Sequence, residues 1–161
     1  MTVSEFPPNL RSMTEWESIM SAVALGLTGD KDKGRAALDS CWDSTSGVEH
    51  AQRCVIAHYL ADLQPSIEDE VVWDEVALSE HAHVTDEDLA SLGMQSAAHL
   101  AASLHLNLGD GYLRQGRVAA AGVQLAAGLD ACGALPTDGY GALIRSGLDR
   151  LQHRIREAAR H

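Results

Sequence analysis

Small residues at fixed distances between residues 107 and 129 constrain the fold of this chain more than any other feature. Gly109 and Ala121 are small enough to let two helix backbones approach closely. Larger apolar side chains fill the space beside that contact: Leu108, Tyr112 and Leu125. Gly116 lies between the two helical patterns, where the chain needs a left-handed or open backbone. The spacing therefore predicts two antiparallel helices joined by a tight turn.

The residues that carry this pattern are Asn107, Leu108, Gly109, Tyr112, Gln115, Gly116, Ala121, Leu125 and Leu129. In kind and spacing they resemble a tetratricopeptide repeat, a helical hairpin of roughly 34 residues. The resemblance implies an all-α, right-handed α-solenoid of antiparallel hairpins. It also implies a mode of action in which a concave groove binds a peptide or helix of another protein.

Two earlier segments repeat the pattern less completely. In the first, Gly29 is the turn glycine, and Ala22 and Gly34 are the small residues of the helix contact. In the second, Ala57 is the small residue and Pro65 replaces the turn glycine. The repeat-like units expected in the single domain 1–161 are residues 14–46, 48–82 and 100–135, followed by a capping helix over 138–160.

Two further helix starts lie outside these hairpins. Thr85, followed by acidic residues, predicts a capped helix before the third unit, with a break at Gly93. Asp138 predicts the start of the capping helix. The apolar stripe of that helix is Tyr140, Leu143, Ile144, Gly147, Leu148, Leu151 and Ile155. Its outward face is Arg145, Asp149, Arg150, Arg154 and Arg156.

Negative charge is concentrated in the middle of the chain. Residues 54–113 contain eleven carboxylates and no lysine or arginine, so this span has the same net charge, −11, as the whole chain. Such a surface repels nucleic acid and anionic lipid and attracts a basic peptide. The alternative is that these carboxylates are solvated helix faces that keep an alanine-rich protein in solution.

Composition and the chain start favour a helical protein of the cytoplasm. Hydrophobic residues make up 45% of the chain and aromatic residues only 4%, which suits closely packed helices. The first ten residues lack the basic start and apolar run of a signal peptide, and no segment has the length of a membrane span. Cys41, Cys54 and Cys132 match no zinc or disulfide spacing, so we expect small apolar packing residues.

The tetratricopeptide resemblance implies which residues line a groove. In that family the first helix of each unit faces the partner. The positions carried over onto this sequence are Trp16, Ile19, Val23, Cys54, His58, Asp62, Leu106, Asn107, Asp110 and Arg114. Asn107 matches an asparagine that bonds the backbone of a ligand. His58, Asp62 and Asp110 favour a ligand with positive groups or hydrogen-bond donors. The alternatives are solvated polar residues and, for Trp16, a core position.

The candidate enzyme and metal motifs lack residues, or the residue spacing, that their chemistry requires. The segment after Gly29 is similar to a phosphate-binding loop, but Arg35 stands where that loop has lysine. Cys54 and His58 are four residues apart, yet no orienting acid accompanies them. His81 and His83 point apart on a helix. We therefore expect no catalytic residue, no metal and no cofactor.

The sequence thus predicts a non-catalytic interaction module for a protein or peptide partner, with no nucleic acid or membrane involved. Two other classes stay open. One is a small-ligand-binding protein or enzyme that uses the acidic, histidine-containing groove. The other is a self-associating unit, a homodimer, that packs through Trp16, Ile19 and Val23.

Overall fold

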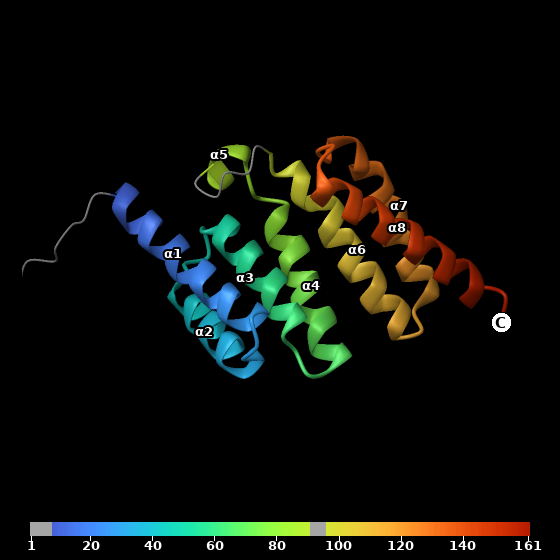
Figure 1. Ribbon diagram of the computed structural model, residues 1–161, viewed down its shortest axis with the longest axis horizontal. Helices are drawn as coiled ribbons and strands as arrows, with labels where there is room; N and C mark the ends of the chain where they lie inside the picture. The colour runs from blue at the N-terminus through green and yellow to red at the C-terminus, as the bar shows by residue number, and fades with distance from the viewer. Residues whose placement is uncertain (1–7, 91–95) are drawn as a thin grey trace, which may run out of the picture.

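The computed structural model describes residues 8–90 and 96–161, and within these ranges the only regular elements are helices. The all-α prediction is confirmed. No helix of the described part is both long and apolar enough to cross a lipid bilayer. The elements in chain order (Figure 1) are α1 Pro8–Leu27, α2 Lys31–Ser44, α3 His50–Asp62, α4 Ile67–His81, α5 Asp86–Leu89, α6 Ala98–Arg114, α7 Val118–Ala131, the 3-10 helix η2 Cys132–Ala134, and α8 Gly139–Ala158.

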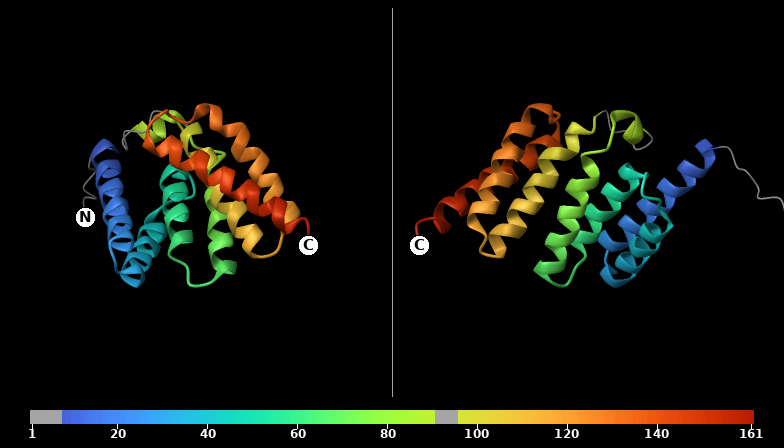
Figure 2. Two further views of the ribbon diagram at one scale, coloured as in Figure 1. Left: turned by 45° about the vertical axis from the view of Figure 1, so that its right-hand side comes forward. Right: turned by 180° about the vertical axis from the view of Figure 1, so that it is seen from behind.

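Consecutive helices pack in pairs. α1 lies against α2, α3 against α4, and α6 against α7, and short connections make each pair antiparallel. The pairs follow one another along the longest axis of the molecule, with α2 contacting α3 and α4 contacting α6 (Figures 1 and 2). α8 closes the sequence of pairs by packing on both α6 and α7.

Glycine sets the turns of the first and third pairs. Gly29 has φ 140° and Gly116 has φ 76°, in the left-handed region that a side chain disfavours. Both turns were predicted from the sequence. The second pair is joined differently. The Ser66 hydroxyl accepts a hydrogen bond from Asp69 N and so caps the N-terminus of α4.

The predicted close contact of the third pair is present. A Cβ atom added at Gly109 would lie 3.6 Å from Ala121 O and 3.2 Å from Gln124 Cβ. The three side chains expected beside this contact are buried: Leu108, Tyr112 and Leu125. In the first pair the close contact is displaced. Gly34 meets Gly26 rather than Ala22, because α1 crosses α2 one turn nearer to the connecting loop.

The helix predicted after Thr85 is the single turn α5. Thr85 and Asp88 form a reciprocal capping box, in which each side chain accepts from the other residue's backbone N–H. The expected break at Gly93 lies outside the described residues. On the far side of that segment, Ala97 N donates to Asp86 Oδ1 at 2.7 Å, and the Ala97 carbonyl lies 2.7 Å from His81 Nε2.

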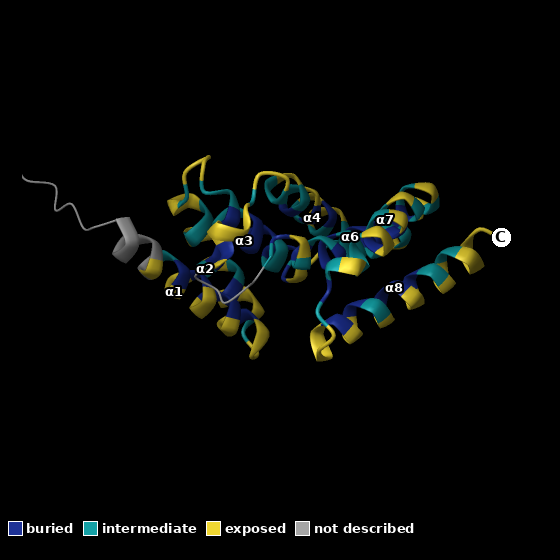
Figure 3. Ribbon diagram, turned by 90° about the horizontal axis from the view of Figure 1, so that it is seen from above, coloured by how far each residue is buried: buried dark blue, intermediate teal, exposed yellow. Residues whose placement is uncertain are grey.

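α8 begins where the sequence predicted, with Asp138 Oδ1 accepting from Gly141 N at 3.0 Å. Its inner face is buried and its outer face exposed (Figure 3). Tyr140 and Leu143, expected in the apolar stripe, are 39% and 62% exposed. Arg145, expected outside, folds back and donates to the carbonyl of Leu135, which is left free by the end of η2.

A compact polar cluster joins α2, α3 and α4 away from these turns. Arg53 Nε donates to Glu80 Oε1 at 2.8 Å, and the Arg53 guanidinium lies 3.8 Å from the centre of the Trp42 ring. Trp42 in turn packs edge-on against Trp73 at 5.0 Å. One arginine therefore contributes both an ion pair and a cation–π contact between three helices.

We expect Arg53→Ala to lower the free energy of unfolding by about 2 kcal/mol, because it removes these contacts and leaves the largely buried Glu80 carboxylate with a bond to His50 but without the guanidinium. Chemical denaturation measures the loss. Lys33→Ala is the control, since its ion pair with Asp30 is exposed and is expected to contribute under about 1 kcal/mol. Equal losses in the two variants would contradict this account of the cluster.

Candidate functional site

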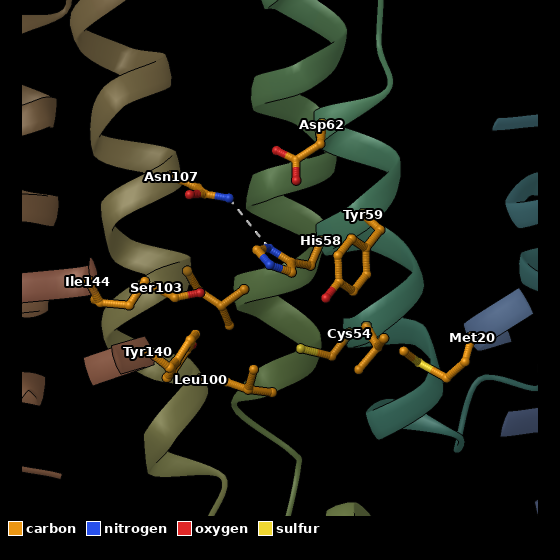
Figure 4. A pocket seen from close by; sticks show the side chains of 12 residues that line it. Met20, Cys54, His58, Tyr59, Asp62, Leu100, Ser103, Asn107, Tyr140 and Ile144 are labelled. Carbon is orange, nitrogen blue, oxygen red and sulfur yellow. Dashed lines mark hydrogen bonds between the residues drawn. The ribbon is translucent and has the colours of Figure 1, made fainter. Parts of the chain in front are cut away.

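A pocket of about 380 Å³ opens where α1 and the start of α8 flank α3 and α6 (Figure 4). We call it the apolar pocket. Met20 of α1 forms one wall, and Tyr140 and Ile144 of α8 form the opposite wall. The lining residues from α3 and α6 are Cys54, Val55, His58, Tyr59, Asp62, Leu100, Ser103, Leu104 and Asn107. The pocket thus joins segments that lie far apart in the sequence.

A few polar groups interrupt the apolar lining. Asn107 of α6 points towards His58 of α3, and its Nδ2 donates to His58 Nδ1 at 3.5 Å (Figure 4). Burial lowers the pKa of His58, although the nearby Asp62 carboxylate opposes the shift. Ser103 is 5% exposed and lines the same pocket, and its hydroxyl makes no hydrogen bond within the described part of the chain. The pocket therefore offers uncharged hydrogen-bonding groups inside an apolar enclosure.

Asp62 lies at the end of the apolar pocket, and although the residue as a whole is exposed, neighbouring protein groups crowd its carboxyl. Restricted hydration of its carboxyl raises its pKa, while His58 and Lys31 act in the opposite direction. No ion pair or hydrogen bond of its carboxylate is present among the residues that the structure describes. Asp62 is therefore a partly desolvated carboxylate that still has its acceptor capacity.

A second pocket of about 250 Å³ adjoins the first, and Asp62 and Asn107 line both. We call it the ion-pair pocket. Asp110 on its wall accepts from Arg114 Nε at 2.8 Å and also pairs with Arg154 of α8. Arg114 extends the network to Glu70 of α4. Two predicted groove residues, Asp110 and Arg114, are thus neutralised by each other and by α8.

The other predicted groove positions separate into two sets. Leu106 lines the ion-pair pocket and packs against Gly147 of α8. Trp16, Ile19 and Val23 lie in the core and are 4%, 2% and 4% exposed. Buried side chains do not meet a partner, so these three belong neither to a groove surface nor to the self-association face considered from the sequence.

Cys54 and His58 line the same pocket, as a nucleophile and base would. Burial, with a smaller effect of Glu80, raises the pKa of the Cys54 thiol to about 12. The thiol therefore stays protonated at neutral pH beside a neutral imidazole. Among the described residues no group of three histidine, cysteine, aspartate or glutamate side chains could hold a metal ion.

Sequence reasoning missed two features near this site. The walls contributed by Met20 and Tyr140 depend on how α1 and α8 fold back, which no local pattern indicates. Asp74 of α4 is 2% exposed, and neither carboxylate oxygen has a hydrogen-bond partner in the described structure. A signal for Asp74 was present, because it lies three residues from both Val71 and Ala77 on the buried stripe of α4.

Comparison of the chain with models of protein families, with curated proteins and with solved structures finds no match.

Proposed function

We propose that the chain is a non-catalytic interaction module that holds a peptide or helix of a partner protein in the groove formed by the apolar pocket and the ion-pair pocket. In this proposal the three helix pairs and α8 make a right-handed solenoid of the tetratricopeptide type, with α8 as its capping helix. The observation that carries the proposal is the apolar pocket itself, whose mostly apolar lining is interrupted by the hydrogen-bonding side chains of His58, Ser103 and Asn107.

The arrangement of helices supports a binding role. First helices of successive pairs, α3 and α6, supply the floor of the groove, and α1 and α8 supply its walls. Rigid helices hold these groups in place without the partner, which reduces the ordering cost of binding. The chemistry of the site supports the same view, because the one thiol in the pocket is protonated and buried.

The test uses a photoreactive amino acid, benzoylphenylalanine, placed at position 140 on the pocket wall. Tyr140 is already aromatic and 39% exposed, so the replacement suits the position. We expect crosslinks to a protein from an extract of the cells that make this chain. The matched control carries the same group at position 123, where Val123 is 66% exposed on α7, away from the groove.

Crosslinked products that form at position 140, are absent at position 123 and disappear when Met20→Lys is added would support the proposal. Met20 is 40% exposed, so the lysine changes the pocket wall without disturbing the core. The same products from both positions, or none from position 140, would overturn it.

A further inference from the structure

Two kinds of binding surface meet at Asp62. The apolar pocket extends to one side of this residue, and the ion-pair pocket extends to the other, with Asn107 shared between them. The first has mostly apolar walls, formed by side chains such as Met20 and Ile144, whereas the second carries charged side chains beside Leu106 and Leu151. Any ligand that fills the apolar pocket and continues along the groove therefore passes the Asp62 carboxylate.

The charges along this path differ in their availability. Asp110 is paired with Arg114 and Arg154, and Glu70 is paired with Arg114. A ligand cation would have to displace a guanidinium to reach either of them. Asp62 requires no such exchange, because no cation forms an ion pair with it in the described structure, although it lines both pockets.

We propose that the partner segment carries an apolar side chain that enters the apolar pocket and, within about one helical turn, a lysine or arginine that pairs with Asp62. This two-part recognition rests on the proposed function and specifies its ligand. Asn107 and Ser103 supply hydrogen bonds to the ligand backbone between the two anchors. Asp110 takes no part, and its role is to fix α8 against α6.

The probe is a displayed library of random twelve-residue peptides, selected against the intact chain. Enriched peptides are synthesised with a fluorescent label, and their affinities are measured by anisotropy. We expect the enriched sequences to combine a large apolar residue with a lysine or arginine nearby. Asp62→Asn removes one charged hydrogen bond and is expected to weaken binding about tenfold, while its control Asp130→Asn, an exposed carboxylate on α7, leaves affinity unchanged.

A second pair of variants tests the apolar anchor. Met20→Lys places a charge on the pocket wall, and we expect it to weaken binding more than tenfold. Met13→Lys is the matched control, because Met13 is exposed on the same helix and does not line the pocket. Both methionines are exposed, so neither variant is expected to unfold the chain.

The outcomes separate the inference from the function on which it rests. Enriched peptides that lose affinity with Met20→Lys but keep it with Asp62→Asn, or that carry no basic residue, would overturn the two-part recognition and leave the groove as a peptide site. If no peptide is enriched whose binding Met20→Lys weakens, the proposed function fails. Losses with both variants and with neither control support the inference.

Discussion

Replacement of Gly34 by alanine is expected to lower the free energy of unfolding by about 3 kcal/mol, near the upper range for overpacking. A Cβ atom at Gly34 would lie 2.5 Å from Gly26 N, far inside van der Waals contact. The opposing atoms belong to the backbone of α1, so no side chain can rotate to make room. α1 and α2 would have to move apart, with loss of contacts around the buried Leu38.

The same substitution at Gly122 is the control. Nothing lies within 4 Å of a Cβ added there, and Gly122 is inside α7, so alanine is expected to stabilise the helix by about 0.5–1 kcal/mol. Urea denaturation of the two variants and the wild type measures both the expected loss of stability in Gly34→Ala and the expected gain in Gly122→Ala. A Gly34→Ala variant as stable as the wild type would show that the two backbones do not approach as described.

Gly34 also shows which feature of the fold the sequence did not predict. Helix pairs, turn glycines and caps depend on local spacing, and the predictions at Gly29, Gly116, Thr85 and Asp138 are confirmed. The crossing point of two helices is not local. Gly34 could be recognised as a contact residue, but its partner depends on the angle between the helices, which the whole pair sets together.

The candidate site shows the same difference between features that local spacing indicates and features that depend on helix packing. Cys54, His58, Asp62 and Asn107 line one pocket because α3 and α6 both contribute to its lining. The state of Asp110 could not be predicted in the same way. One neutralising partner, Arg114, lies four residues further along α6, a spacing that indicates a pair on one helix face. The other, Arg154, comes from α8, and a pairing across 44 residues of chain leaves no trace in the spacing of either residue.

Asp74 is expected to make stability depend on pH with the opposite sign to an ordinary aspartate. Burial raises the pKa of its carboxyl to about 8, and the nearby Asp62 and Glu70 carboxylates add to the shift, while Arg114 opposes it. Facing α6, the carboxyl lies beside Gly111, where an added Cβ would be 3.9 Å from Asp74 Oδ2. Because the pKa is about 8, the Asp74 carboxyl keeps its proton in the folded protein at neutral pH.

The folded chain holds this proton up to a pH of about 8, whereas the unfolded chain releases it near its ordinary value of 3.8. Between these values the folded state binds more protons, so rising pH favours unfolding. The stabilisation by this group is complete below the unfolded value and is lost as the pH rises through 8. At most it changes by about 1.4 kcal/mol per pH unit, which amounts to several kcal/mol over the window.

Asp74→Asn removes the titration and keeps the shape of the side chain. We expect the variant to gain stability over the wild type steadily from pH 4 to pH 8, with the difference reaching a few kcal/mol, and to change little in relative stability below pH 4. Denaturation at each pH measures the difference. Asp130→Asn, at an exposed position, is the control and is expected to show no such trend. Parallel pH profiles for wild type and Asp74→Asn would mean that the Asp74 carboxyl is ionised in the folded state. It would then need a counter-charge or water that pairs with it between α4 and α6.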